Sequence, residues 1–452
     1  MRTVFAVIAF ALVTGPLVAQ PSSAPPASSP APPAALPPGQ AVSNPVPVSA
    51  GEPALLPGGL DVSRPLTPVE APAVEAPATE PVIIPEAKVI APERPLGPLG
   101  PAWNNIELLF WWPMRQPVPP LVFGTRSGAP PVPRRPGTIL LIGGRSLDTE
   151  PSAGGRFTLG YAINDDQTAG LEVVYFFLGT RTFSESLRDI GGQTRSFGLP
   201  YTNAVSGADE ILTLAVPGAT NSLLTASTSV RVQGWEVNGV ANLHDGKNVK
   251  LNGLAGWRYF QVHEGLRLEQ TQFRPIGTGG VVQTADQFDA HNRFHGGQFG
   301  LHADMRHGAA FCEMTAKIAF GQTYEVVKIE GMTHFAPGSL GPVLRTFGGS
   351  GIFVQPSNAG RTANGVFAVV PEGTLKVGFR VGDTGRIYLG YSFIYLSDAV
   401  RPGDQIDRTL NPAQIPLVSG SGPVYNGDRP LRLVTRSDFW VQGFLLGLET
   451  RY

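Results

Sequence analysis

Hydrophobic and polar residues alternate along most of the chain after residue 102. The C-terminal segment shows the pattern clearly. One parity carries Trp440, Phe444 and Leu446, and the other carries Gly443 and Glu449. Side chains of a β-strand point alternately to its two faces. The alternation therefore predicts a strand with one apolar face and one small or charged face.

Ten segments show this alternation, and they predict ten strands. The connections between them fall into two classes. Four are short and contain Asn, Asp or Gly, the residue types that suit tight turns. Five are long, at roughly 113–153, 181–227, 263–291, 329–372 and 398–436. The predicted strands are 103–112, 154–163, 169–180, 228–243, 248–262, 292–307, 309–328, 373–382, 385–397 and 437–452.

Long and short connections alternate strictly, which indicates how the strands are arranged. Bacterial outer-membrane barrels have short periplasmic turns and long outer loops. In hydrocarbon an unpaired sheet edge is excluded, so the sheet must close. The fold class expected is all-β: a transmembrane antiparallel up-and-down β-barrel of about 10 strands over 102–452, with both termini in the periplasm. Twelve strands are the alternative, if 138–142 and 366–370 each join the wall.

The N-terminal hundred residues have a different composition. Residues 1–19 combine Arg2 with an apolar core and a small residue at Ala19, which predicts a secretory signal peptide. Residues 20–101 hold 22 of the chain's 44 prolines and no aromatic residue. Such a segment buries too little apolar surface to offset its ordering entropy. We therefore expect a disordered Pro/Ala-rich linker before the barrel.

Charge and cysteine content narrow the classes of function. The formal net charge is −1, which argues against a nucleic-acid partner. The single cysteine, Cys312, excludes an intramolecular disulfide framework. Beyond the signal, no stretch reaches the ~18 apolar residues that a membrane helix needs.

The charged residues of the polar parity are the candidate lumen lining. They have two interpretations: they hydrate a conduit and select solutes, or they form a salt-bridged plug in a narrow barrel. Four aromatic residues near strand ends are candidates for the membrane interface: Trp112, Tyr395, Trp440 and Tyr452. The lumen candidates are Glu107, Arg156, Glu172, Arg231, Lys250, Arg258, Asp304, Arg306, Glu313, Lys317, Lys376, Arg380, Glu449 and Arg451.

Four histidines, His291, His295, His302 and His307, are the only cluster that suggests metal binding or acid–base chemistry. By parity only His302 faces the lumen squarely, and a His302–Asp304 pair lacks a nucleophile. No nucleotide-binding, zinc or hydrolase motif occurs. We therefore expect no enzyme activity, no catalytic residue, no metal and no cofactor.

The region 102–452 resembles a large family of β-barrel porins best known from planctomycete outer membranes. The resemblance implies the fold and an outer-membrane location, and it brings no catalytic residue. The stretches that carry it are ELLFWW at 107–112, GGRFTLG at 154–160, LEVVYFFLG at 171–179, GLAGWRY at 253–259, FHGGQFGL at 294–301 and GFLLGLE at 443–449.

Two functions are compatible with these patterns. The first is a porin-like conduit for passive diffusion of small hydrophilic solutes. The alternative is a closed structural or surface-display barrel whose long outer loops bind partners. The partners expected are outer-membrane lipid and, through the C-terminal strand, the barrel assembly machinery. The sequence does not give the oligomeric state.

Overall fold

The computed structural model describes residues 101–144, 150–189, 195–274, 280–336, 344–419 and 427–451. The predicted signal peptide and linker lie outside the described residues. All described residues belong to one compact unit.

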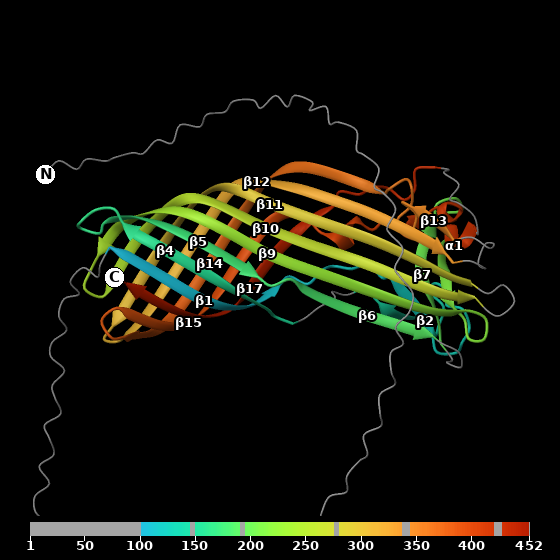
Figure 1. The fold of residues 1–452 in the computed structure, drawn as a ribbon, viewed down its shortest axis with the longest axis horizontal. Coiled ribbons are helices and arrows are strands. Elements are labelled where there is room, and N and C mark those ends of the chain that lie inside the picture. Colours follow the sequence, from blue (N-terminus) through green and yellow to red (C-terminus); the bar gives the residue numbers. More distant parts are fainter. Residues whose placement is uncertain are drawn as a thin grey trace, which may run out of the picture. The chain divides into compact units, whose positions relative to one another are not determined.

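Ten antiparallel strands form a closed ring in sequence order, and the last pairs with the first (Figure 1). The ten predicted strands and the up-and-down barrel are confirmed. The wall consists of β1 (Ala102–Pro113), β4 (Ser152–Ala162), β5 (Ala169–Leu178), β9 (Asn221–Asp245), β10 (Val249–Arg274), β11 (Gly280–His307), β12 (Ala310–Phe335), β14 (Gly360–Val381), β15 (Gly385–Val400) and β17 (Arg436–Arg451).

The register fixes the tilt of the strands. Following paired residues once round the ring from Val366 on β14 leads back to β14 at Gly378, twelve positions away. A shear of twelve over ten strands corresponds to a tilt of roughly 40°. A barrel of this size is only slightly wider than one that its own side chains fill.

The twelve-strand alternative is wrong. Residues 138–142 contain β3 (Ile139–Ile142), which pairs with β2 (Val122–Thr125) in a separate sheet. Residues 366–370 lie inside β14. Pro371 follows them and has no N–H to donate to a neighbouring strand. The strand nevertheless continues through Pro371, opposite Ile318 on β12.

The predicted loop at 263–291 is also wrong, because β10 and β11 run through most of it as a paired hairpin. β10 has 26 residues, whereas about ten cross a membrane. Beyond the membrane the outward residues become polar and the inward residues become apolar: Arg267 and Glu269 are exposed, and Leu266 and Leu268 are buried. In a lipid-facing strand the apolar residues face outward, whereas here they face inward. The pattern of this segment therefore did not predict a wall strand.

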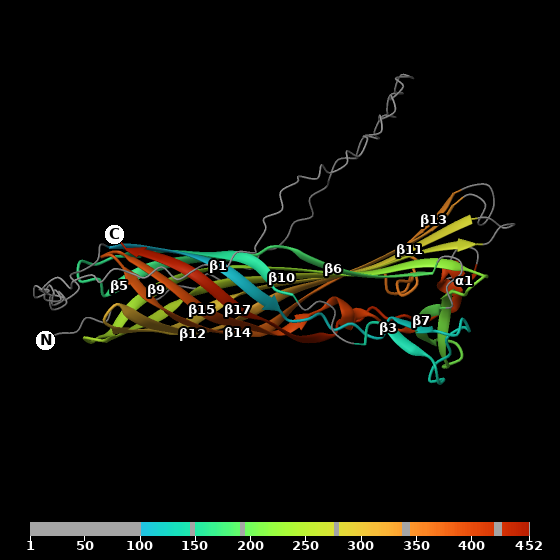
Figure 2. The same cartoon turned by 90° about the horizontal axis from the view of Figure 1, so that it is seen from below.

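The long connections fold together into one body, here called the head, beyond the long-connection end of the barrel (Figure 2). A five-stranded sheet in the order β16-β7-β2-β3, with β8 on β7, is its centre. Its elements are β6 (Arg181–Asp189), β7 (Ser196–Asn203), β8 (Asp209–Ala215), β13 (Arg345–Gly348), η1 (Pro402–Gln405), β16 (Thr409–Leu410), η2 (Pro412–Gln414) and α1 (Pro416–Ser419).

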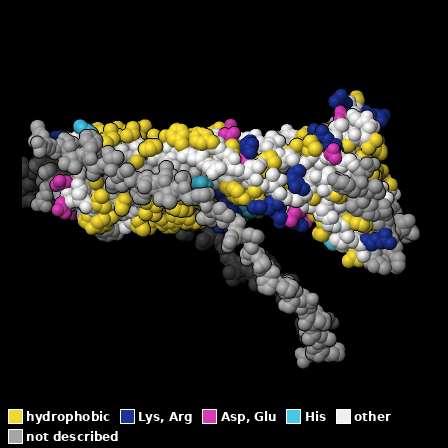
Figure 3. Space-filling model, turned by 90° about the horizontal axis from the view of Figure 1, so that it is seen from above, with side chains coloured by type: hydrophobic (Ala, Val, Ile, Leu, Met, Phe, Trp, Pro, Cys, Tyr) yellow, Lys and Arg dark blue, Asp and Glu magenta, His cyan; other side chains and the backbone are white. Residues whose placement is uncertain are grey.

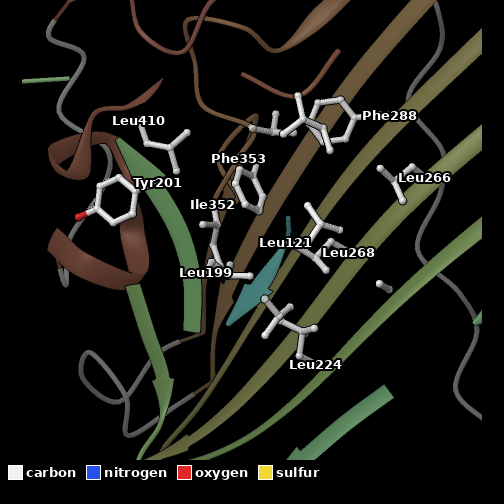
Figure 4. Close-up of a cluster of buried hydrophobic side chains, with 14 of the residues drawn as sticks. Leu121, Leu199, Tyr201, Leu224, Leu266, Leu268, Phe288, Ile352, Phe353 and Leu410 are labelled. Atoms are coloured by element: carbon white, nitrogen blue, oxygen red, sulfur yellow. The ribbon is translucent and has the colours of Figure 1, made fainter. Parts of the chain in front are cut away.

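The head has its own hydrophobic core. Leu199 from β7 and Phe353 from the connection between β13 and β14 pack with Leu224, Leu266 and Phe288 from the extended strands β9, β10 and β11 (Figure 4). The wall extensions therefore serve as one side of the head core, and the long connections fold as a single packed structure.

The outer surface of the barrel carries an apolar belt. No helix among the described residues is long and apolar enough to cross a bilayer. Hydrophobic side chains gather over the short-turn half of the surface, and charged ones gather over the other half (Figure 3). All ten wall strands contribute exposed residues to the belt: Phe110, Leu159, Val173, Val237, Trp257, Phe299, Ile318, Val377, Leu389 and Leu446.

Candidate functional site in the barrel interior

Seven charged side chains meet across the interior in what we call the middle layer. Its three carboxylates and four cations come from several different strands, so no sequence-local pattern brings them together. The Nζ of Lys376 lies 2.7 Å from Glu107, and that of Lys317 lies 2.8 Å from Glu236. The middle layer consists of Glu107, Arg156, Glu236, Arg258, Lys317, Glu372 and Lys376.

Glu372 connects the middle layer. It forms ion pairs with Arg258, with Lys317 at 3.4 Å and with Arg156 at 3.5 Å. All of these side chains are at least nine-tenths buried. Unpaired buried charges are costly, so each charge needs the partners that the opposite wall supplies.

A second network, the turn-end layer, lies nearer the short turns. Arg386 is its centre: its guanidinium lies 2.7 Å from Glu313 and 3.2 Å from Asp304. The terminal nitrogens of Arg306 also reach Asp304, at 2.6 Å. The turn-end layer consists of Asp304, Arg306, Glu313, Arg386, Glu449 and Arg451. Its three carboxylates balance its three guanidinium groups.

The structure places most of the predicted lumen residues inside the barrel. Ten of the fourteen belong to one of the two layers. Glu172 and Lys250 line the interior cavity beside them. Arg380 has the inward parity of β14, opposite Arg386. The ten layer members are Glu107, Arg156, Arg258, Asp304, Arg306, Glu313, Lys317, Lys376, Glu449 and Arg451.

The prediction for Arg231 was wrong. Arg231 is exposed on the outer surface of β9, whereas its neighbour Val232 is 1% exposed and faces inward. In the sequence, Val230, Val232 and Val240 share one parity with Glu236 and Asn238, and the prediction for Arg231 took that parity to face the lipid. Glu236 and Asn238 mark the inward parity, and both are buried.

Three network residues were missed. Glu236 fell on the face that had been assigned to lipid. Glu372 preceded the predicted start of its strand because Pro371 broke the pattern. Arg386 has the same parity as Tyr388 and Ser392, which the pattern had placed on the inner face, so this signal was present in the sequence.

Space left by glycines in the wall is filled by aromatic rings from neighbouring strands. Gly447 lies under the ring of Tyr388, and a Cβ at residue 447 would collide with it. The Tyr388 hydroxyl donates to Oε1 of Glu107 at 2.8 Å. Trp103 covers Gly160 in the same way. These glycines therefore add no open lumen.

An apolar plug fills the barrel between the middle layer and the head. Phe176, Phe260, Phe294, Trp111 and Phe439 point inward and are each at most 2% exposed. The Arg156 guanidinium lies 5.0 Å from the centre of the Trp111 ring, so charge and plug are in direct contact. The sequence did not predict this plug, because a lumen in contact with water was expected to be polar.

The buried ion pair Arg401–Glu264 lies between the plug and the head. Its nitrogen–oxygen distance is 2.6 Å, and the two side chains are 0% and 2% exposed. Arg401 also donates to the carbonyl oxygens of Met114 and Arg115 at 3.0 Å. Its donors therefore hold the first residues after β1 against β10.

A cavity of about 180 Å³ lies inside the barrel. Its lining runs from Trp103, Lys250 and Arg451 near the short turns to Lys317 and Glu372 of the middle layer. The cavity has room for several waters or a small polar molecule. It reaches the ion pairs of the middle layer, beyond which lies the plug.

The four predicted histidines do not converge. His291 and His295 lie on the outward parity of β11, and His307 is exposed at its end. His302 faces the cavity and shares a hydrogen bond of 2.9 Å with Thr315. Asp304 bonds to Arg306 and Arg386. Within the described ranges, no three His, Cys, Asp or Glu side chains are placed to hold a metal.

Three of the four predicted interface aromatics face outward at one edge of the belt. Tyr395 is paired with Trp440 across β15 and β17, and the rings of Trp112 and Phe444 meet at 6.0 Å. Tyr452 lies outside the described residues. Trp235, Tyr259 and Tyr324 occupy the same edge on β9, β10 and β12 and were missed.

The family described as "Putative beta barrel porin-7 (BBP7)" has a sequence model that matches residues 103–452. The chain belongs to this family. It is therefore a porin-like outer-membrane β-barrel, as its belt and closed ring indicate. No curated protein matches the chain.

Solved structures that the chain resembles are outer-membrane proteins at 8–9% identity. The outer membrane protease OmpT from Escherichia coli matches with a TM-score of 0.38, over 78% of this chain and 98% of that one. The P. putida toluene transporter TodX gives 0.19, over 78% and 90%. A Pseudomonas aeruginosa FadL homologue gives 0.22 over the same shares.

Proposed function

We propose that this protein is a closed outer-membrane barrel that presents the head outside the cell and acts by binding a partner there. The observation that carries the proposal is the filled interior. Two charged layers and an apolar plug occupy the barrel, and the plug residues are almost completely buried. An apolar constriction also opposes ions by excluding water.

The proposed orientation puts the start of β1 and the end of β17 on the periplasmic side of the membrane. The start of β1 and the end of β17 lie at the same end of the barrel as the four short turns. Short turns face the periplasm in bacterial barrels. In this orientation the head is extracellular, and the outward face of β17 contacts lipid and the assembly machinery. The role we propose is binding, without catalysis.

Passive diffusion of small hydrophilic solutes is the second candidate, and one observation favours it. The cavity of about 180 Å³ is lined by charged groups and lies at the short-turn end. A conduit would need the plug to move aside, because the cavity ends at the middle layer. Any solute that passes would have to be small and polar.

Removing β6, β7 and β8 from the head tests the proposal. A variant in which 181–220 is replaced by a short linker removes β6, β7 and β8 and keeps all ten wall strands. We expect the variant to insert into the outer membrane. Cells that carry it should no longer bind the surface that wild-type cells bind through the head, and their uptake of small sugars should be unchanged. A loss of sugar uptake in cells that lack the protein entirely would support the conduit instead.

A further inference from the structure

The outer surface just beyond the apolar belt carries a cluster of cationic and imidazole groups on five adjacent strands, here called the basic patch. Arg231 on β9, His263 on β10 and His291 on β11 are paired neighbours across the sheet. Arg293 follows two positions after His291, and Arg361 is paired with Lys328. The basic patch is Arg231, His263, His291, Arg293, Lys328 and Arg361.

The guanidinium groups of the basic patch have no carboxylate partners. Among the described residues, Arg231, Arg293 and Arg361 form no ion pair, and all three are exposed. Arg231 donates only to the amide oxygen of Gln233, at 3.3 Å. Lys328 differs, because Glu330 neutralises it at 2.7 Å. Asp289, opposite Lys328 across β11 and β12, is a further carboxylate beside the patch.

The pKa values of the two histidines at the centre of the basic patch are lowered, in part by the nearby positive charges. The rings of His263 and His291 stack with their centres 3.6 Å apart. Burial and the charges of His263, Arg293, Arg361 and Lys328 lower the pKa of His291 to about 4. Burial also lowers the pKa of His263, with Arg231 and Arg293 contributing. Both imidazoles are therefore neutral at neutral pH, and an anion beside them would favour their charged forms.

The position of the basic patch indicates the partner. Its lower edge is continuous with the belt: Arg293 is paired with Tyr324, and Trp235 and Tyr259 lie one outward position below the row of Gln233 and Gln261. Aromatic residues of this kind lie at the headgroup level of a bilayer. On β15 and β17, the exposed charged groups beyond the belt include Asp398 and Asp438. Arg436 on β17 is exposed as well, but Glu325 neutralises it at 2.9 Å.

We propose that the basic patch binds the phosphate of an anionic membrane-lipid headgroup, whose acyl chains lie on the apolar belt below it. Guanidinium groups match phosphate oxygens in geometry and charge. Arg231 and Arg293 lie two strands apart, roughly 10 Å across the sheet, and are offset by two residues along it, so both long side chains can reach a single phosphate between them. The site does not depend on whether the lumen passes solutes.

The test uses the folded full chain in bicelles that contain equal amounts of phosphatidylglycerol and phosphatidylcholine. Native mass spectrometry counts the lipids retained. We expect the wild type to retain phosphatidylglycerol preferentially. The variant with Arg231→Gln, Arg293→Gln and Arg361→Gln should lose this preference by about a hundredfold, since each arginine near a charged membrane contributes roughly fivefold.

The matched control is Arg126→Gln, Arg135→Gln and Arg188→Gln, which removes the same charge from exposed head residues and should leave lipid retention unchanged. A titration of the wild type with salt gives an independent readout that needs no variant. The preference for phosphatidylglycerol should fall as the salt concentration rises, because salt screens the charges of the patch. Equal retention of both lipids, or an unchanged preference in the patch variant, would overturn the proposal. Complete displacement by inorganic phosphate would also overturn it, since the site would then hold a free anion.

Discussion

At the scale of single residues, the interior is held by ion pairs that the lipid-facing wall encloses. Burying such pairs gives little net stability, but removing one partner leaves a buried charge uncompensated. Glu372 is the most connected carboxylate, because it contacts three cations. The loss of a single carboxylate there therefore affects charges on three other strands.

We predict that Glu372→Gln lowers the free energy of unfolding by about 3 kcal/mol, because the four buried cations of the middle layer then share only two carboxylates, Glu107 and Glu236. Urea unfolding in lipid vesicles, followed by heat-modifiable migration on a gel, measures the change. Glu330→Gln is the matched control, since it breaks only the exposed pair with Lys328. The exposed pair should contribute little to stability, because water and salt screen it. Equal effects of the two substitutions would contradict the proposed role of the middle layer.

His291 gives a pH-dependent prediction. Its pKa in the folded state, about 4, lies below the ordinary 6.5. Its contribution to stability is therefore complete above about pH 6.5 and is lost as the pH falls toward 4. Arg293→Gln together with Arg361→Gln should raise this pKa toward its ordinary value, as measured by NMR titration of the imidazole. Arg126→Gln should not change it. An unchanged pKa in the double variant would show that burial alone sets it.

At the scale of elements, the extensions of β10 and β11 connect the barrel and the head. Leu266 and Phe288 are directly paired and both lie in the head core. We predict that replacing 266–288 by a two-residue turn leaves a barrel that still shifts on heating in a detergent gel. The head should become sensitive to protease because it loses one wall of its core. A protease-resistant head in this variant would mean that the head folds without the wall.

A carboxylate holds the 352–354 segment against β11. Asp286 accepts backbone N–H bonds from Ile352, Phe353 and Val354 at 3.0–3.1 Å. Gly351 lies against it, and a Cβ there would collide with the carboxylate. We predict that Gly351→Ala speeds amide hydrogen exchange at 352–354, and that Asp286→Asn costs about 2 kcal/mol because donors are left unpaired. Gly348→Ala, with open space around it and no positive φ, tests whether any glycine change has this effect.

The elements also show how much of the fold could be predicted from the sequence. The alternation around Leu446 identified a lipid-facing strand because lipid contact imposes a single polarity on that face. It failed at β9, where apolar residues lie on both faces: Val232 is buried inside beside Glu236, and Val237 is exposed outside. The alternation failed again beyond the belt, at Leu266. There the outer face contacts water and the inner face packs into the head core, so the apolar residues face inward. A local pattern gives the strand, but its inner face depends on partners from distant strands, such as Arg258 and Glu372.

At the scale of the whole molecule, the barrel has three zones along its axis. The short-turn end holds the cavity and the turn-end layer, the centre holds the middle layer and the apolar plug, and the far end holds the head. The plug closes the path between the cavity and the head. Phe260 and Phe294 are paired across β10 and β11, and together with Phe176 they occupy the barrel axis.

Current recordings across a planar lipid bilayer test this closed interior most directly. We predict no discrete conductance steps for the wild type over many insertions, with insertion verified by protease protection. The variant with Phe176→Ala and Phe294→Ala should show steps, because it opens the plug beside the cavity. Reproducible steps from the wild type, of the same size as those of the variant, would contradict the account and establish an open pore.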